Sequence, residues 1–322
     1  MLNIKITSTG YHAPPKVETA EDLAPKIGRS AKWIKSRTGV INRHIAEESM
    51  DVLGAKAAKT ALGDGRAPDC LLNASTTPLQ LLPDSSVFIM RQLGYKGIPS
   101  WSVHATCLSF VVALINAGTL LETNIYKKIL IVSSETGTPW RNMKEAESAS
   151  LFGDAAAAAV VEKTPDSESS RIIDWEMNTW PEGAEFTEFR GAGTKHPPGH
   201  PEKTKPEDNL FHMRGTRVYR MARKRVGEAL EELLGRNTLS AKDIDWLVPH
   251  QASGPALASV DDYGIDQSKV INIVGEYGNT IASSTPLALA VADEKGLIKR
   301  GDLLLLGGTG AGLSVAFALV QW

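Results

Sequence analysis

The stretch W-S-V-H-A-T-C-L-S-F-V-V-A-L-I-N-A-G, from Trp101 to Gly118, decides how the rest of the chain is interpreted. It begins like a short buried strand, and Phe110 to Ile115 is apolar on every side, which is typical of an interior helix. Cys107 lies at the junction, where the unpaired N–H groups of a helix start favour a thiolate. Two interpretations of Cys107 are open: a nucleophile held by a rigid element, or one more small residue of the core.

Length and composition place the chain among ordinary globular proteins. Its 322 residues suffice for one large domain or two of average size. Hydrophobic residues make up 42% and charged residues 22%, so a substantial core is expected. The formal net charge of −2 gives no reason to expect a nucleic acid as partner.

The cysteine content and the absence of long apolar runs bear on the compartment. The only two cysteines, Cys70 and Cys107, argue against a disulfide framework and fit a reducing environment. The first residues lack the pattern of a secretory signal, and no apolar run is long enough to cross a bilayer. We therefore expect a cytoplasmic protein that is not bound to a membrane.

The hydrophobic pattern predicts alternating strands and helices, which favours an α/β layered fold over a helix bundle or a β-sandwich. In the first half, strands are predicted at 4–7, 70–75, 129–134 and 152–161, and helices at 19–27, 30–40, 51–62, 85–93 and after Cys107. A polar segment, 163–170, is interpreted as a linker between an N-terminal half, 1–165, and a C-terminal half, 166–322.

The second half is predicted to follow a similar plan. Strands are predicted at 171–178, 244–249, 271–274, 303–306 and 313–320, a basic amphipathic helix at 214–234, and a long functional loop at 181–208. Asn279 is predicted to open a second buried helix that matches the one after Cys107. The similar order of elements suggests an internal duplication.

The histidines are the first candidates to assist Cys107. Of seven, His250 stands out because it closes the apolar strand D-W-L-V-P-H, and α/β proteins place their sites at the carboxyl ends of strands. A histidine at the edge of the core is an equally good interpretation. His196, His200 and His212 fall in or beside the long loop and are expected to be solvated. Asn279 follows E-Y-G, where an ordinary helix N-cap is the simplest explanation.

Six segments, in the same order, resemble β-ketoacyl-acyl-carrier-protein synthase III, of the thiolase superfamily. They are W-I-K-S-R-T-G-V-I-N-R-H-I-A (33–46), the Cys107 segment, L-F-G-D (151–154), D-W-L-V-P-H-Q-A (245–252), G-N-T-I-A-S-S (278–284) and G-G-T-G-A-G (307–312). The resemblance spans essentially the whole chain. It implies a five-layered αβαβα fold built from two duplicated halves, a homodimer, and a catalytic triad of Cys107, His250 and Asn279.

The resemblance also implies a reaction without a separate cofactor, in which thioesters of coenzyme A or phosphopantetheine are the substrates. Cys107 would take the acyl group, and His250 and Asn279 would stabilise the enolate formed when a malonyl thioester loses carbon dioxide. The N–H groups of Cys107 and Ala311 would form the oxyanion hole for the acyl carbonyl. The glycines beside Ala311 fit such a turn, and they also fit a plain hairpin.

Departures from the family pattern concern the substrates. Leu108 and Ser109 replace smaller family residues and are expected to narrow the acyl pocket, while Thr309 replaces a family Phe beside the site. Pro255 and Asp262 stand where basic residues for carrier-protein docking are usual, and a family Arg beside adenine falls near Ala146.

Three basic or aromatic residues are nevertheless expected at the substrate entrance. Trp33 and Arg37 are kept, and Arg220 lies on the basic helix at 214–234. Trp33 is interpreted either as a surface for adenine stacking or as a helix anchor. Arg220 and its neighbours are interpreted either as a docking face for acyl-CoA or acyl carrier protein or as a solvated surface.

Three functions compete on the sequence alone: a decarboxylating condensing enzyme, a plain acyltransferase of the same fold, and a catalytically silent subunit of a condensing heterodimer. Asn279 argues against plain acyl transfer, because no enolate needs stabilising there. The intact Cys107, His250 and Asn279 argue against a silent subunit. The order Cys, His, Asn also occurs in papain-like proteases, but their local cysteine motif is absent and the alternating pattern does not suit them.

Overall fold

The computed structural model describes all residues, 1–322, and contains two main β-sheets. The first sheet has the order β1-β7-β6-β4-β5, and the second has the order β11-β12-β13-β8. The strands of the first sheet are β1 (Ile4–His12), β4 (Cys70–Asn73), β5 (Ser100–Ser102), β6 (Lys128–Glu135) and β7 (Ala155–Lys163). Those of the second are β8 (Arg171–Thr179), β11 (Trp246–Pro249), β12 (Leu303–Gly310) and β13 (Ser314–Gln321).

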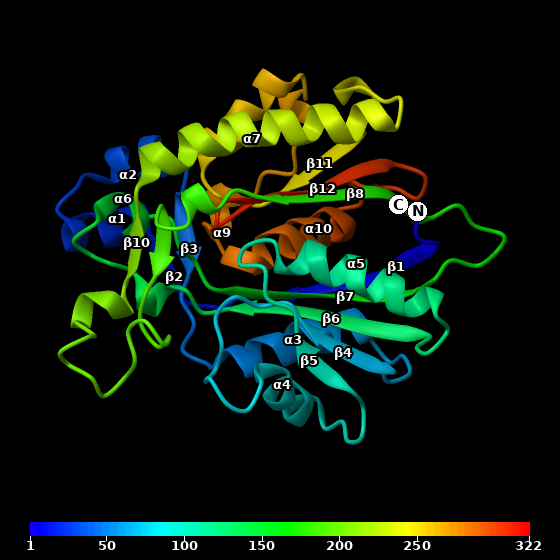
Figure 1. Ribbon diagram of the computed structural model, residues 1–322, viewed down its shortest axis with the longest axis horizontal. Coiled ribbons are helices and arrows are strands. Elements are labelled where there is room, and N and C mark those ends of the chain that lie inside the picture. The colour runs from blue at the N-terminus through cyan, green and yellow to red at the C-terminus, as the bar shows by residue number, and fades with distance from the viewer.

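Helices cover both faces of each sheet. Helices α5 (Ser109–Glu122) and α10 (Ser284–Glu294) lie between the sheets and contact both of them. Helices α3 (Met50–Leu62) and α4 (Ser85–Leu93) cover the outer face of the first sheet, and α7 (Gly215–Arg236) covers the outer face of the second. Figure 1 shows the resulting five layers, with α7 at the top, α5 and α10 in the middle, and α3 and α4 at the bottom. The predicted αβαβα architecture is confirmed.

Short elements gather at one end of the layers, on the left of Figure 1. The helices are α1 (Ala20–Leu23), α2 (Ala31–Thr38), α6 (Ala146–Ala149), α8 (Gly254–Ala258) and α9 (Val274–Tyr277). The strands pair as β2 (Val17–Thr19) with β3 (Asn42–His44), and β9 (Thr187–Phe189) with β10 (Phe211–Met213).

The apolar sequence of α5 and β7 explains why their side chains are buried. Helix α5 carries no charged residue before Glu122, and Phe110, Leu114 and Ala117 are fully buried. Strand β7 contributes five consecutive alanines, 155–159, whose alternate side chains belong to the core on either face of the sheet. Small side chains on an inner strand of a covered sheet let both helix layers approach closely.

Most predicted elements are found, but the strand predicted at 271–274 is wrong. The isolated bridge to Leu247 is made by the preceding Val270, only the Ile271 N–H still donates to Leu247, at 2.9 Å, and α9 begins at Val274. The buried side chain of Gln251 explains the difference. Its Nε2 donates to the carbonyl of Ile271 at 2.9 Å, and its Oε1 accepts the N–H of Ile273 at 2.9 Å. These side-chain bonds replace the ladder that a neighbouring strand would provide.

Two predicted helices also need correction. The helix predicted at 19–27 is α1 followed by a 3₁₀ turn at Ala24–Ile27 that contains Pro25. The helix predicted to open at Asn279 begins at Ser284, after a 3₁₀ turn at Ile281–Ser283. The basic helix runs to Arg236, slightly past its predicted end.

The long predicted loop is better ordered than the sequence suggests. It contains β9 and a 3₁₀ turn at Pro206–Asn209. The imidazoles of His196 and His212 are only 17% and 20% exposed, against the expectation of solvated side chains. His212 Nδ1 lies 2.8 Å from a Glu145 carboxylate oxygen, which ties this segment to α6.

The termini lie close together at the right of Figure 1. No helix is long and apolar enough to cross a membrane.

Candidate active site

Cys107 lies on a tight turn between β5 and α5. Thr106 has a φ of 51°, a left-handed conformation that side chains other than glycine rarely adopt. The Ser109 hydroxyl fixes the turn, because it accepts the N–H of Ala105 at 3.0 Å and donates to the carbonyl of Thr106 at 2.6 Å. Backbone strain of this kind, maintained by surrounding hydrogen bonds, is common at active sites.

The surroundings of the thiol oppose ionisation more than the sequence suggests. Burial, with a smaller effect from Glu135, raises the pKa of Cys107 to about 12, although the residue keeps some exposure. The main-chain N–H groups of Cys107 and Ala311 act in the other direction and stabilise the thiolate. The helix start therefore supports a thiolate less than the sequence suggests, because α5 begins two residues later, at Ser109, and burial outweighs it.

The turn at 310–313 follows β12 of the second sheet and lies next to Cys107, which follows β5 of the first sheet. The Thr106 hydroxyl donates to the carbonyl of Ala311 at 3.4 Å. A Cβ on Gly310 would lie 2.5 Å from that hydroxyl oxygen, so only glycine allows the approach. Gly312 has a φ of 150°. The glycine turn thus brings the Ala311 N–H to the thiol.

His250 follows β11 directly and is held by its main chain. Its N–H donates to the carbonyl of Gly307 at 2.8 Å, and the residue is only 6% exposed. Burial lowers the pKa of the imidazole to about 4, while the backbone of Ile281 offsets this in part. Nδ1 is buried without a hydrogen-bond partner of normal geometry. The ring is therefore neutral near pH 7, able to accept a proton at one nitrogen and donate one from the other.

Asn279 follows α9, and its side chain lies near the segment that carries His250. Its main chain lies beside the L-F-G-D segment, with Asn279 N–H donating to Leu151 at 2.8 Å and Gly153 N–H donating to Asn279 at 3.1 Å. Its side chain is 8% exposed. Oδ1 accepts the N–H of Ile281 at 2.9 Å, and Nδ2 makes a long bond of 3.3 Å to the carbonyl of Ala252.

These contacts place the candidate residues on segments that touch one another. Cys107 meets the Ala311 turn, and the strand before that turn passes His250 at Gly308. His250 and Asn279 are linked through Ala252 and through Ile281. The thiol, the neutral imidazole and the amide therefore lie on contacting segments in one partly buried region.

Glu135 is a residue that the sequence reasoning missed. It ends β6, is fully buried, and accepts the N–H groups of Thr76 at 2.5 Å and Thr77 at 3.0 Å. Burial raises its pKa to about 7, and it lies near enough to Cys107 to affect the thiol. A lone carboxylate that closes the apolar run I-L-I-V-S-S-E is the signal that could have revealed it.

The predicted entrance residues lie on α2 and α7. Trp33 is partly buried beneath Arg29, whose guanidinium carbon lies 5.4 Å from the ring centroid. Arg37 pairs with Glu147 at 3.0 Å, while Arg220 is exposed and has no carboxylate partner. Ser30 caps α2 and Gly39 ends it with a φ of 77°, as the sequence predicts.

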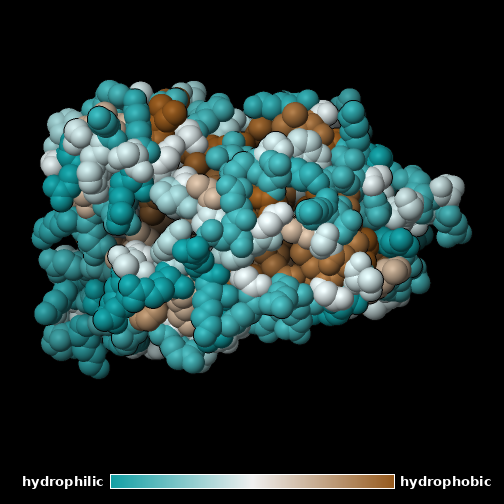
Figure 2. Space-filling model, turned by 90° about the horizontal axis from the view of Figure 1, so that it is seen from above, coloured by the Kyte–Doolittle hydropathy of each residue, from teal (hydrophilic) through white to brown (hydrophobic).

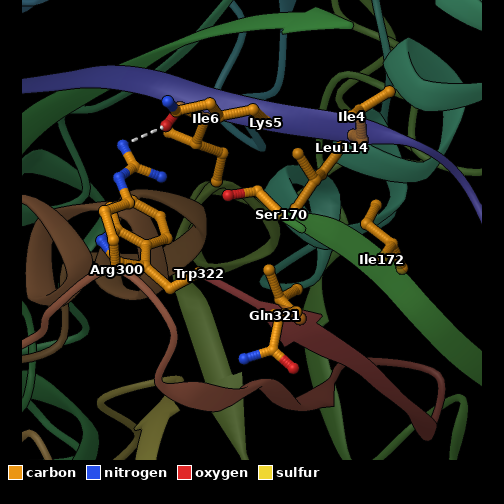
Figure 3. A pocket seen from close by; sticks show the side chains of 10 residues that line it. Ile4, Lys5, Ile6, Leu114, Ser170, Ile172, Arg300, Gln321 and Trp322 are labelled. Atoms are coloured by element: carbon orange, nitrogen blue, oxygen red, sulfur yellow. Dashed lines mark hydrogen bonds between the residues drawn. The ribbon is translucent and has the colours of Figure 1, made fainter. Parts of the chain in front are cut away.

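A small cavity elsewhere in the molecule is structural in character. Figure 3 shows Arg300 among its lining residues, with its guanidinium donating to the carbonyl of Ile6 at 2.8 Å and lying over Trp322. Its other walls are mainly apolar and come from β1, α5 and the ends of β8 and β13. None of the candidate catalytic residues lines this cavity.

The chain is similar to known proteins over nearly its whole length. Residues 102–181 match the family model described as 3-oxoacyl-[acyl-carrier-protein (ACP)] synthase III, and residues 234–322 match the model of its C-terminal region. A Synechocystis protein named β-ketoacyl-[acyl-carrier-protein] synthase III is 35% identical, over 99% of this chain and 98% of that protein. The chain belongs to the 3-oxoacyl-[acyl-carrier-protein] synthase III family. The resemblance seen in the sequence is confirmed.

Solved structures of synthase III proteins have the same fold. The enzyme from Pseudomonas aeruginosa superimposes with a TM-score of 0.90 and 26% identity, covering 99% of this chain and 98% of that one. A priming β-ketosynthase of the R1128 polyketide pathway gives a TM-score of 0.88 and 27% identity, covering 98% and 96%. The synthase III architecture thus extends over the entire chain.

Proposed function

We propose that this synthase III family member catalyses a decarboxylative Claisen condensation between an acyl thioester and a malonyl thioester. The observation that carries the proposal is the contact between the Cys107 turn and the glycine turn, where the Thr106 hydroxyl donates to the Ala311 carbonyl at 3.4 Å and the main-chain N–H groups of Cys107 and Ala311 lie beside the thiol. Two such donors beside a sulfur nucleophile are the groups that an acyl-transfer intermediate requires. We assign Cys107 as the nucleophile, and Cys107 with Ala311 as the oxyanion hole.

The first half-reaction loads the enzyme. The Cys107 sulfur attacks the carbonyl of the acyl thioester, an S–C bond forms, and the bond to the leaving thiol breaks. Because burial raises the pKa of Cys107 to about 12, its proton must leave as the new bond forms. We assign the neutral imidazole of His250 to accept that proton and to pass it to the departing thiol.

The second half-reaction forms the carbon–carbon bond. A malonyl thioester loses carbon dioxide, and its carbonyl oxygen takes the enolate charge, which His250 and Asn279 stabilise by donating hydrogen bonds. The long Asn279 Nδ2 contact of 3.3 Å leaves this donor weakly engaged in the free enzyme. The enolate carbon attacks the acyl carbonyl, the bond to sulfur breaks, and the released thiolate takes up a proton from solvent. The product is a 3-oxoacyl thioester.

Substrates are proposed to be thioesters of coenzyme A or of an acyl carrier protein, which enter past α2 and α7. Trp33 is proposed to face the adenine of coenzyme A, and Arg37 and Arg220 the phosphates or an acidic carrier. Arg binds phosphate through paired N–H groups, and an aromatic face suits adenine.

We further propose that the protein acts as a homodimer in the cytoplasm. Leu81, Leu82 and Val87 are 64%, 84% and 47% exposed, within a single stretch of seven residues. Such a group of exposed apolar side chains is typical of an interface. Both cysteines are free, as expected in a reducing compartment. Analytical ultracentrifugation of wild type and Leu82→Asp tests the dimer, since the variant should sediment as a monomer.

The function is tested by incubation with an acyl-CoA and malonyl-CoA or malonyl carrier protein. We expect equal amounts of carbon dioxide and 3-oxoacyl product from the wild type, and no 3-oxoacyl product from Cys107→Ala. Transfer of the acyl group to an alcohol or amine, without loss of carbon dioxide, would contradict the proposal and support the plain acyltransferase.

A further inference from the structure

A second pocket lies on the outer side of the second sheet, under α7. Most of the residues that line it are hydrophobic. Its inner end includes His250, which is 6% exposed, with Gly308 and Thr309, and its mouth includes Tyr219, which is 41% exposed, with Tyr263. Cys107 is not among its lining residues. Figure 2 views this side of the molecule from above, with apolar residues visible between the hydrophilic ones.

The walls of this pocket are suited to an uncharged chain. Val226 and Leu230 of α7 face Leu247, Ile265 and Phe317 across it. Apart from the Tyr219 hydroxyl, the polar side chains near the mouth are already engaged. Arg223 pairs with Asp262 at 2.7 Å, the Tyr263 hydroxyl donates to the Arg223 carbonyl at 2.8 Å, and the Ser259 hydroxyl donates to Ala256 at 2.8 Å. Removal of an aliphatic group from water into such a space is favourable, whereas an amide would lose hydrogen bonds.

Small residues line the pocket beside His250. Ala252, Gly308 and Thr309 belong to its lining. A Cβ on Gly308 would come within 3.1 Å of the His250 Cβ, so a larger residue there would displace His250. Beside Cys107, Leu108 is buried, and a Cβ on Gly310 would lie 3.2 Å from its Cγ. An apolar space thus adjoins His250.

We propose that this pocket holds an alkyl substituent on the carbon of the second thioester that forms the new bond. The proposal rests on the function proposed above, in which His250 and Asn279 hold the carbonyl oxygen of that thioester. The reacting carbon is bonded directly to that carbonyl, so a substituent on it starts beside His250, at the inner end of the pocket. The substrate class is therefore an alkylmalonyl thioester rather than malonyl alone.

The same reaction steps apply when the reacting carbon of the malonyl thioester carries an alkyl substituent. The alkylmalonyl thioester loses carbon dioxide, and the substituted enolate carbon attacks the acyl carbonyl on Cys107. The carbon–sulfur bond to Cys107 breaks, and the product is a 2-alkyl-3-oxoacyl thioester. The pantetheine arm is the competing occupant, but its two amide groups would find few free partners along these walls.

The first test measures binding without catalysis, using 1-decanol as an uncharged probe. We expect calorimetry to detect binding to wild type and to Cys107→Ala, and about tenfold or greater loss in Thr309→Phe and Val226→Phe, which fill the pocket. Thr309→Val keeps the volume at the inner end, and Val218→Phe makes the same change on α7 outside the lining, so both should bind decanol as the wild type does. No binding to wild type, or equal binding to every variant, would overturn the inference.

The second test measures kcat/KM for malonyl-CoA and butylmalonyl-CoA with one acyl-CoA. We expect the wild type to use both, and the ratio of butylmalonyl to malonyl turnover to fall about tenfold or more in Thr309→Phe but not in Thr309→Val. An equal loss with both substrates would overturn the inference in favour of a pantetheine channel. If no second substrate is condensed at all, the proposed function fails, while decanol binding still decides whether the pocket accepts an alkyl chain.

Discussion

At the scale of single residues, His250 and Asn279 are expected to have different roles in acylation and condensation. Asn279→Ala should lower condensation by about 10² or more, the usual effect of losing one oxyanion donor, and leave self-acylation of Cys107 nearly intact. His250→Ala should slow both steps, because burial keeps the thiol protonated and a base is needed. Rapid-quench acylation and steady-state condensation rates separate the two. An Asn279→Ala variant that condenses at the wild-type rate would exclude this role for Asn279.

Glu135 carries a pH-dependent prediction at the same scale. Burial raises its pKa from 4.5 to about 7, so the folded protein keeps a proton that the unfolded chain releases. The contribution of this carboxyl to stability is therefore lost as pH rises from about 4.5 to about 7. Glu135→Gln should gain stability relative to wild type across this window, by about 1–3 kcal/mol. Urea unfolding at several pH values measures it. Glu162→Gln, on the neighbouring strand, is the control, and a difference that stays constant with pH would contradict the prediction.

At the scale of elements, the close approach of two segments positions Asn279. A Cβ on Gly153 would lie 2.1 Å from the carbonyl oxygen of Tyr277. Gly153→Ala should therefore displace the chain at 277–279, lower stability by about 1–3 kcal/mol, and reduce condensation. Gly193→Ala, where a Cβ meets no atom within 4 Å, should change neither. Thermal unfolding and condensation assays on the pair decide. Equal behaviour of the two variants would mean that the contact does not position Asn279.

Helices α2 and α7 carry the prediction about the entrance. Trp33→Ala should raise KM for acyl-CoA more than for acyl carrier protein, because only coenzyme A has an adenine to stack. Arg220→Glu should do the reverse and make carrier binding less sensitive to salt. Steady-state kinetics with both donors at two ionic strengths provide the measurement. Small and equal effects of both substitutions on both donors would place the entrance elsewhere.

The elements also show where sequence reasoning succeeds and where it stops. Helix α4 begins and ends as predicted, and α2, with Ser30 as its N-cap and Gly39 as its C-cap, lies within its predicted range of 30–40, because local signals decide both helices. The segment 271–274 has the composition of a strand, but a distant side chain, that of Gln251, satisfies its backbone. The pKa of Cys107 likewise depends on layers that pack around it, which local sequence does not describe. Contacts between segments far apart in the chain account for both errors.

At the scale of the whole molecule, the candidate site lies where the two halves of the chain meet. Residues 4–163 supply the first sheet and the turn with Cys107, and residues 171–321 supply the second sheet, His250, Asn279 and the Ala311 turn. Neither half therefore holds the complete set of proposed catalytic groups. The internal duplication stays a prediction, because nothing in the architecture measures common origin.

The central claim is that Cys107 carries the acyl group, and intact-protein mass with peptide mapping tests it most directly. After incubation with acyl-CoA, the account predicts a mass increase of one acyl group, located on the peptide that contains Cys107. The adduct should be absent in Cys107→Ala, retained in Cys70→Ala, and discharged when a malonyl thioester is added. An acyl adduct that persists in Cys107→Ala, or that maps to Cys70, would contradict the account.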